Sequence, residues 1–149
     1  MAKLLAIAIK ERKKAPMQLL TQANVSLQHG IANDFRGKPG KRQVTVLSKE
    51  AWLTACEEVD TELDWLVRRA NLLVEGVVLH ESIDKKLKIG DVELLITGET
   101  DPCKRMEQVK DGLFNALAKG WRGGVTCRVL TEGTIQLNDE VQLLAKIND

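Results

Sequence analysis

Aromatic residues are scarce in this sequence: they make up 3% of the chain, and tyrosine is absent. Proteins that bind single-stranded nucleic acid stack bases on aromatic side chains, so the shortage disfavours a stacking surface of that kind. It also means that the core must be aliphatic. The two histidines, His29 and His80, lie far apart, and neither is close to a cysteine or carboxylate at ligand spacing. No zinc site is therefore indicated.

Cysteine is equally sparse. Cys56, Cys103 and Cys127 are an odd number of thiols without paired spacing. This pattern argues against a disulfide framework and against a zinc site built from Cys-x-x-Cys pairs. We therefore expect reduced thiols.

Charge of one sign is not in excess, because 22 Lys and Arg face 21 Asp and Glu, a formal net charge of +1. No global positive field draws the protein onto nucleic acid or an anionic membrane, so a basic site must be local. Long apolar runs are missing too: residues 4–9 fall far short of the roughly 18 residues of a membrane helix. The charged residues 10–14 follow where a signal peptide would have small residues. We predict a cytoplasmic protein without membrane contact.

The composition that is present, 44% hydrophobic and 29% charged in 149 residues, is typical of one folded domain spanning residues 1–149. No phosphate-binding loop, dinucleotide-binding glycine turn or Ser-His-Asp order with a nucleophile elbow occurs. Ordinary hydrolase and nucleotide-binding functions therefore lack supporting motifs.

The hydrophobic pattern favours strands over helices. Strands are predicted at residues 2–9, 17–21, 43–47 and 70–78, with a polar loop over residues 30–41. Residues 86–97 and 134–145 each resemble a strand, a tight polar turn and a second strand. Helices are predicted at residues 49–58, capped by Ser48, and within residues 102–119. These elements predict a mostly β (α+β) fold with a few short helices, arranged as a curled sheet or small β-barrel.

Of the three thiols, Cys103 has the surroundings that favour chemistry. Cys56 and Cys127 lie at apolar positions of a helix and a strand, which predicts inert packing. Cys103 follows Asp101 and Pro102, a pair that fits the cap and first position of a helix. A cysteine at the second helical position would have its thiolate stabilised by free backbone N–H groups, although such a cysteine can equally be structural.

Three segments carry cations that could bind an anion. The glycine- and proline-punctuated loop 35–42 contains Arg36 and Arg42 among its basic residues and can cradle a phosphate or simply be a solvated basic loop. The turn Arg122, Gly123 and Gly124 lets backbone approach a ligand, although turn geometry alone also explains its glycines. The segment 68–71 precedes a buried strand, and its arginines either cap that strand or point into a site.

Taken in order, these pieces resemble the MOSC domain, the module named for the C-terminal part of molybdenum cofactor sulfurases. The residues that carry the resemblance are Gly30, Ile31, Asp34, Arg36 and Gly37, then 42–48, Glu50, Trp52, Arg69, Asn71, Leu72, Val74 and Gly76, then Ile89, Gly90, Leu94, Thr97, Pro102, Cys103, Met106, Gly112, Leu113, 122–125, Arg128 and Val129.

The resemblance implies that Cys103 is the catalytic residue, either as a ligand to molybdenum or as a carrier of sulfur. It also implies that the molybdenum cofactor, a phosphorylated pterin, is bound by residues of the matching segments. These are Arg36, Arg42, Arg69, Asn71, Thr97, Arg122, Gly123, Gly124 and Arg128. Thiolate is a soft ligand, which suits this metal.

The chain also departs from the family pattern. Residues 33–36 replace a Gly-Asp-Arg-His style turn, and Asn138 stands where the closing turn usually has glycine. The pyridoxal-phosphate desulfurase domain of eukaryotic sulfurases is missing, so no pyridoxal phosphate is expected here. A cysteine desulfurase or an electron-donor protein would have to be a separate partner.

The sequence thus predicts a stand-alone MOSC protein that binds molybdenum cofactor, acting in reduction of N-hydroxylated compounds or in metal–sulfur cofactor assembly. Whether it is a molybdenum-dependent oxidoreductase or a sulfurtransferase stays open. One alternative is a non-catalytic β-barrel module that binds RNA or another polyanion through its basic loop, although nucleic acid is disfavoured by the charge balance. A regulatory protein that kept the fold and lost the cofactor is the other. The sequence indicates no oligomeric state.

Overall fold

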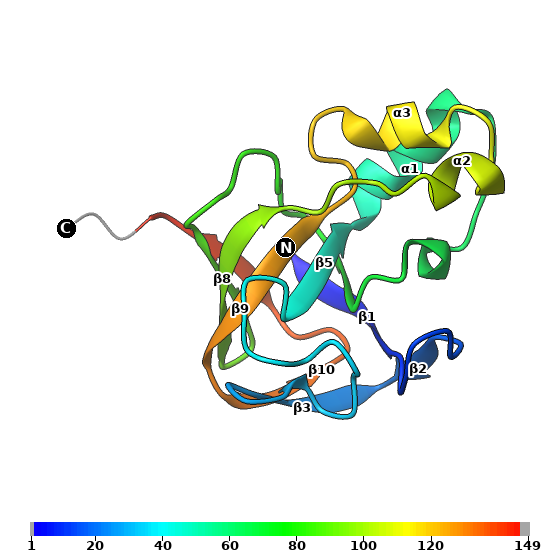
Figure 1. Ribbon diagram of the computed structural model, residues 1–149. Coiled ribbons are helices and arrows are strands. Elements are labelled where there is room, and N and C mark those ends of the chain that lie inside the picture. Colours follow the sequence, from blue (N-terminus) through cyan, green and yellow to red (C-terminus); the bar gives the residue numbers. More distant parts are fainter. Residues whose placement is uncertain (1, 147–149) are drawn as a thin grey trace.

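Strands form most of the regular secondary structure in the computed structural model, which describes residues 2–146 (Figure 1). Three short α-helices and a 3₁₀ turn complete the described part of the chain. The strands are β1 (Lys3–Ile9), β2 (Gln18–Leu20), β3 (Gln22–Ser26), β4 (Gly30–Ile31), β5 (Val44–Ser48), β6 (Leu72–Glu75), β7 (Lys86–Ile89), β8 (Val92–Glu99), β9 (Val125–Thr131), β10 (Gly133–Gln136) and β11 (Val141–Leu144). The helices are α1 (Lys49–Glu58), η1 (Trp65–Arg68), α2 (Arg105–Val109) and α3 (Leu113–Ala118).

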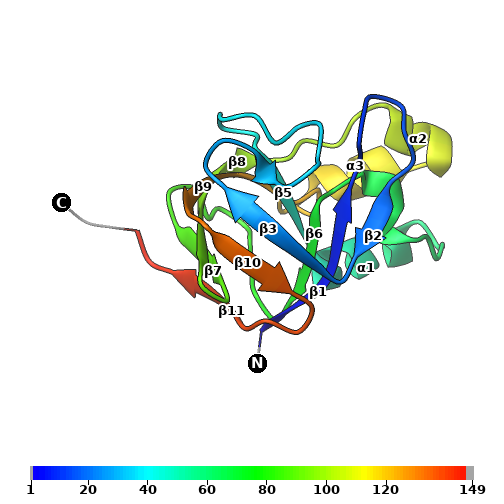
Figure 2. The same ribbon diagram turned by 90° about the horizontal axis from the view of Figure 1, so that it is seen from below.

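Eight strands form one large mixed sheet in the order β11-β7-β8-β9-β5-β6-β1-β2. Its neighbours pair antiparallel except β5 and β6, which are parallel because the long connection containing α1 and η1 carries the chain back between them. A small sheet, β10-β3-β4, lies across the large one (Figure 2). The predicted mostly β, curled architecture is confirmed, but the ladder of the large sheet does not close into a complete barrel in the described residues.

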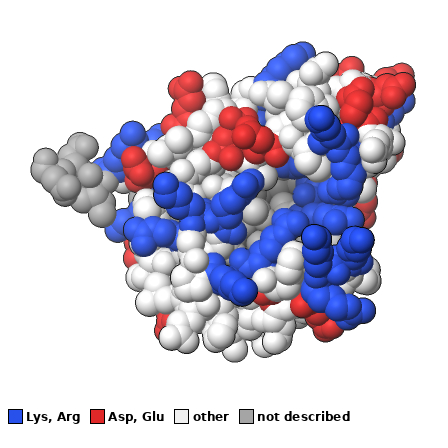
Figure 3. Space-filling model, in the orientation of Figure 1, with Lys and Arg blue, Asp and Glu red and all other residues white. Residues whose placement is uncertain are grey.

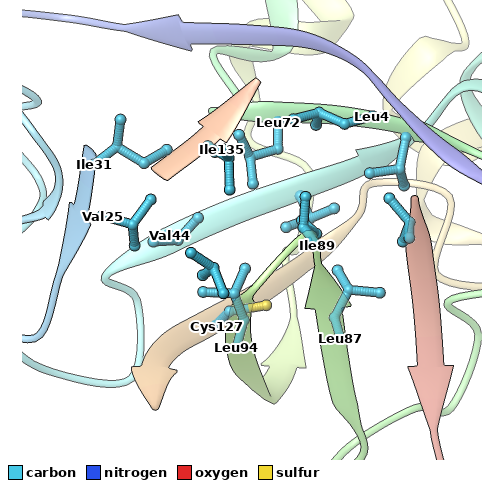
Figure 4. Packing of buried hydrophobic residues seen from close by; sticks show 14 of the residues in the cluster. Leu4, Val25, Ile31, Val44, Leu72, Leu87, Ile89, Leu94, Cys127 and Ile135 are labelled. Atoms are coloured by element: carbon cyan, nitrogen blue, oxygen red, sulfur yellow. The ribbon is translucent and has the colours of Figure 1, made fainter. Parts of the chain in front are cut away.

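An aliphatic core fills the space enclosed by the two sheets. It joins Val25, Ile31 and Ile135 of the small sheet to residues of the large sheet such as Leu72 (Figure 4). The Cys127 side chain points into this cluster and is fully buried, which confirms its predicted packing role.

A second core lies between the large sheet and the helices, which gather at one end of the molecule (Figure 1). The prediction for α1 is confirmed, because Ser48 Oγ accepts a hydrogen bond from the Ala51 N–H at 3.2 Å and caps the helix. Trp52 and Cys56 of α1 are buried in this cluster, so Cys56 also has the predicted packing role.

The helix predicted within residues 102–119 is two helices instead of one. Lys110 has an extended backbone (φ −158°, ψ 131°) and Gly112 is left-handed (φ +87°), so the chain turns between α2 and α3. The Glu107 carboxylate accepts hydrogen bonds from the N–H groups of Gly112 at 2.9 Å and Phe114 at 3.3 Å. The apolar pattern resembled one helix because Met106 of α2 and Leu113 and Leu117 of α3 are all buried in the second core. Val109, which also fits the pattern, is exposed.

One of the two predicted hairpins is also wrong. Residues 86–97 form a hairpin, with Ile89 opposite Val92. Residues 134–145 do not, because β10 pairs with β3 and β11 pairs with β7. The turn between them instead binds β1: the Asn138 N–H donates to the Leu4 carbonyl at 2.8 Å. The chain therefore passes from the small sheet to the large one at this turn.

No helix in residues 2–146 is long and apolar enough to cross a membrane.

Candidate functional site

Cys103 lies in the wall of a pocket of about 210 Å³. An adjoining pocket of about 620 Å³ shares four of its lining residues, so the two form one hollow. Figure 3 shows Lys and Arg side chains gathered around a hollow on this face. The residues that line the smaller pocket are Arg36, Arg42, Thr45, Val46, Arg68, Arg69, Ala70, Thr100, Asp101, Cys103, Arg105 and Gly123.

Cys103 precedes the helix that was predicted to contain it. The residue before α2 is Lys104, and no side chain caps the helix. Asp101 therefore does not have the predicted capping role. The link to the helix is through the backbone: the Cys103 carbonyl accepts a hydrogen bond from the Met106 N–H at 3.0 Å. The side chain is exposed, whereas Pro102 before it is buried.

The surroundings of Cys103 favour its thiolate. Partial burial raises the pKa of the thiol, but the Arg105 backbone N–H, its guanidinium and the Met106 N–H together outweigh burial and lower the pKa overall. Burial raises the pKa of the other two thiols, Cys56 and Cys127. Cys103 is thus the one thiol of the chain with both exposure and a favoured anionic form.

Arg68 is the most buried cation of the pocket, with 8% of its surface exposed. It ends η1, which Asp64 caps by accepting from the Leu66 N–H at 2.9 Å. Its Nη2 donates to the Gly123 carbonyl at 2.6 Å, which ties η1 to the turn before β9. The next residue, Arg69, is left-handed (φ +58°), and this turn places both arginines in the pocket wall.

The loop that carries Arg36 and Arg42 is held from inside by Gln43. Its side-chain amide donates to the carbonyls of Leu27 at 2.8 Å and Gly37 at 3.0 Å, and its oxygen accepts from the Val129 N–H at 2.9 Å. Gln43 is 2% exposed, so these bonds are shielded from water. This buried amide fixes the loop on β9 and so fixes the two arginines beside the pocket.

Lys10 adds a further cation behind this loop. It is 3% exposed, and its Nζ lies 4.8 Å from the centre of the Phe35 ring. Burial, followed by the charges of Arg36 and Arg69, lowers the pKa of Lys10, while Asp34 opposes this change. Lys10 therefore lies within electrostatic reach of Arg36 and Arg69, although it does not line the pocket.

The positive charge of the pocket is not neutralised by the protein. None of its five arginines forms an ion pair with a carboxylate in the described residues, and the one acidic residue in its wall is the exposed Asp101. Of the five, Arg68 is buried, whereas Arg36 and Arg42 are exposed. A buried cation without a partner is costly. The local arrangement suits an anionic ligand, although the chain as a whole is close to neutral.

The structure brings five of the predicted site residues together. Arg36, Arg42, Arg69 and Gly123 line the pocket with Cys103. The thiol, three guanidinium groups and the glycine of the turn before β9 thus share one pocket wall.

The other predicted cofactor-binding residues have structural partners outside the pocket lining. Asn71 is 5% exposed; its amide oxygen accepts from the Thr45 N–H at 3.0 Å, and its nitrogen donates to the Ala8 carbonyl at 3.1 Å. The Thr97 hydroxyl bonds the Lys41 carbonyl and lies 3.0 Å from the Thr126 carbonyl. Both residues therefore support the strands and the loop around the pocket.

Arg122, Gly124 and Arg128 likewise lie outside the lining. Arg122 Nη1 is 2.8 Å from Glu58 Oε1, an ion pair that joins the turn to α1. Gly124 (φ +102°) packs so closely against the Val46 carbonyl that a side chain would collide with it. Arg128 is exposed on β9.

Sequence reasoning did not select Arg68, Thr100 and Arg105 as site residues, yet all three line the pocket. Arg68 was visible only as a cation before a buried strand, and Arg105 only as a charge near Cys103. Thr100 had no local signal. These three residues come together only through the pairing of distant segments, and a local sequence pattern does not indicate such pairing.

The structure thus places an exposed thiol among arginines at one end of a curled mixed sheet. The sequence profile of the MOSC domain matches residues 27–142, and the chain belongs to this family. No match to a curated protein was found.

Solved structures share the fold. YuaD of Bacillus subtilis has a TM-score of 0.79 and 18% identity, covering 99% of this chain and 98% of that one. YiiM of Geobacillus stearothermophilus has a TM-score of 0.75 and 14% identity, covering 97% and 75%. YiiM of Escherichia coli has a TM-score of 0.71 and 12% identity, covering 99% and 72%. The chain is thus similar in fold to proteins of comparable or greater length.

Proposed function

We propose that this MOSC protein binds the molybdenum cofactor and uses Cys103 as a ligand to molybdenum or as a carrier of persulfide sulfur. The observation that carries the proposal is the exposed Cys103 thiol, with its lowered pKa, in a pocket lined by five arginines that form no ion pair within residues 2–146. The protein would act in the cytoplasm, with an electron donor or a cysteine desulfurase as partner, in reduction of N-hydroxylated compounds or in metal–sulfur cofactor assembly.

The residues present fit such a group. A thiolate is the soft donor that this metal accepts, and guanidinium groups bind phosphate oxygens through two parallel hydrogen bonds. Cys103 faces the smaller pocket, whereas Arg36 and Arg42 line both pockets, so one elongated ligand could contact the thiol and these arginines together. When bound, the cofactor supplies redox chemistry at its metal. The protein's own residues bind and orient it.

The ligand role is tested by metal retention. Wild type, Cys103→Ala and Cys56→Ala are purified from a host that makes the cofactor, and molybdenum and pterin are measured in each. Cys103→Ala should lose molybdenum, whereas Cys56→Ala should keep it because Cys56 is buried in the helix-side core. Unchanged molybdenum in Cys103→Ala would remove the ligand role.

In the carrier role, the Cys103 thiolate attacks the terminal sulfur of a persulfide on a cysteine desulfurase. The sulfur–sulfur bond of the donor breaks, the donor cysteine leaves as a thiolate, and Cys103 becomes the persulfide. Incubation with a desulfurase and free cysteine should add one sulfur atom to Cys103, read by mass spectrometry of the intact chain and its peptides. A Cys103→Ser chain should gain none. Absence of the added sulfur in wild type would exclude this role.

The exposed basic loop favours a second candidate, a polyanion-binding module. Lys38 and Lys41 line the larger pocket with Arg36 and Arg42, and no metal chemistry is needed for this role. Such binding would fall steeply with salt and survive Cys103→Ala. Affinity for RNA that behaves in this way, together with no molybdenum in the purified protein, would favour the module over the cofactor protein.

A further inference from the structure

The wall of the smaller pocket contains two buried hydrogen-bonding groups without a partner. Arg68 Nε and Thr100 Oγ1 are both buried, and neither has a hydrogen-bond partner in the described residues. Both residues line the pocket that Cys103 faces. Unpartnered buried polar atoms are rare in folded proteins because each costs about 1–3 kcal/mol. Finding two of them in one pocket wall is a feature that packing alone does not explain.

The Arg68 guanidinium has hydrogen-bond donors that no group in the described residues accepts. Of its three side-chain nitrogens, only Nη2 has a hydrogen-bond partner in the described residues, namely the Gly123 carbonyl at 2.6 Å. The residue as a whole is 8% exposed, and its guanidinium forms no ion pair with a carboxylate in residues 2–146. Besides the charge of the nearby Cys103 thiolate, an anion that accepts hydrogen bonds would satisfy these free donors and the guanidinium charge.

The backbone around these two residues is built to hold them close together. The Thr100 N–H donates to the Gly124 carbonyl at 2.8 Å, which ties the end of β8 to the turn before β9. A Cβ on Gly123 would collide with the Thr100 carbonyl and lie 3.1 Å from Arg68 Nη2. Glycine at this position thus allows the two strand ends and the guanidinium to share one wall.

We infer that Arg68 and Thr100 form a subsite for a divalent tetrahedral oxyanion, a phosphoryl group or a free ion such as sulfate, beside Cys103. The two side chains supply donors of different kinds, and Arg69 and Arg105 in the same wall add positive charge. A carboxylate or a neutral ligand would leave more of this charge uncompensated. The subsite belongs to the pocket of the proposed function, but its donors are independent of the thiol.

The test uses the full chain purified from a host that does not make the pterin cofactor. Sulfate and phosphate are titrated by calorimetry at constant ionic strength, with chloride as the monovalent control. Wild type should bind one divalent oxyanion per chain and show no matching signal with chloride. Thr100→Val removes the hydroxyl with little change in shape and should weaken binding about tenfold or more, the loss of one hydrogen bond to a charged group. Arg68→Lys should weaken it by at least as much.

Matched controls separate the subsite from general charge. Thr21→Val and Arg12→Gln change exposed residues of the same types outside the pocket and should leave binding unchanged. Cys103→Ser should also keep oxyanion binding, so failure of the proposed metal or sulfur role would not be confused with failure of the subsite. No oxyanion binding by wild type, or equal binding by Thr100→Val and Arg68→Lys, would overturn the inference.

The source of the oxyanion is identified by repeating the titration on protein from a cofactor-producing host. Loss of sulfate binding there would mean that the phosphoryl group of the cofactor occupies the subsite. Unchanged sulfate binding would mean that the subsite serves a free oxyanion. Either result is compatible with a subsite formed by Arg68 and Thr100. Whether the subsite exists is decided by the Thr100→Val and Arg68→Lys variants.

Discussion

Arg68 and Gly123, 55 residues apart in sequence, are joined by a hydrogen bond of 2.6 Å from the guanidinium to the glycine carbonyl. This contact connects η1, which ends the long crossover between β5 and β6, to the turn that begins β9. The position of a buried cation in the Cys103 pocket is therefore set by the backbone of a distant turn. A change at either residue should alter the pocket without touching the thiol.

Gly123→Ala should destabilise the protein by about 1–3 kcal/mol, the usual effect of overpacking, because the new methyl group meets the Thr100 carbonyl. Gly98→Ala is the matched control: its Cβ would have an ordinary contact of 3.7 Å with Thr126 Oγ1. The midpoints of urea unfolding measure both effects. A Gly123→Ala midpoint equal to that of wild type would mean that the two strand ends are not held closely together.

Alkylation of Cys103 by iodoacetamide should rise with pH around a midpoint below that of an ordinary cysteine, whose pKa is about 8.5. The thiolate is the reactive form, and the neighbouring N–H groups and Arg105 lower its pKa. Arg105→Gln should move the midpoint upward. Peptide mass spectrometry follows the reaction, and the buried Cys56 and Cys127 provide unreactive internal controls. A midpoint at or above 8.5 in wild type would contradict the favoured thiolate.

Asn71→Ala should lower the free energy of unfolding by about 2 kcal/mol or more, because it leaves the Thr45 N–H and the Ala8 carbonyl without their buried partner. The matched control is Asn24→Ala, which removes an exposed side-chain hydrogen bond to Thr134 and should change stability far less. Urea unfolding measures both variants. Equal and small losses would show that Asn71 does not hold the strands together.

Arg122→Gln should leave the molybdenum content of purified protein unchanged, since Arg122 pairs with Glu58 and is not part of the pocket wall. Arg42→Gln should reduce that content, because Arg42 lines both pockets. Both proteins are compared after a check of folding by circular dichroism. Loss of metal in folded Arg122→Gln would place a cofactor contact at the turn.

Local patterns in the sequence predicted the elements that local forces determine. The bounds of α1 follow from the Ser48 cap and the apolar spacing of Trp52 and Cys56. The helix break at Gly112 and the short strand β3 were missed, since the former depends on backbone geometry and the latter on its pairing with β10. Strand pairing is decided by distant partners, so residues 134–145 could imitate a hairpin without forming one.

The sequence predicted those parts of the candidate site whose residue type and immediate neighbours already indicate a chemical role. Cys103 stood out by its neighbours, and the basic loop by its arginines. The convergence of Arg68 and Thr100 on the thiol depends on the crossover between β5 and β6 and on the close contact at Gly123. Such contacts between distant segments are properties of the fold, which explains why predicted residues such as Arg122 and Asn71 proved to have structural partners instead of lining the pocket.

The Cys103 pocket lies where the two hydrophobic cores of the molecule meet. Met106 anchors the segment after Cys103 in the helix-side core, whereas Val46, in the pocket wall, belongs to the core between the sheets. Regions with separate cores can open at different free energies. A ligand that contacts both the thiol and the guanidinium groups would connect the region around the helix-side core to the region around the core between the sheets. Amide hydrogen exchange should therefore slow in both regions when the ligand is bound.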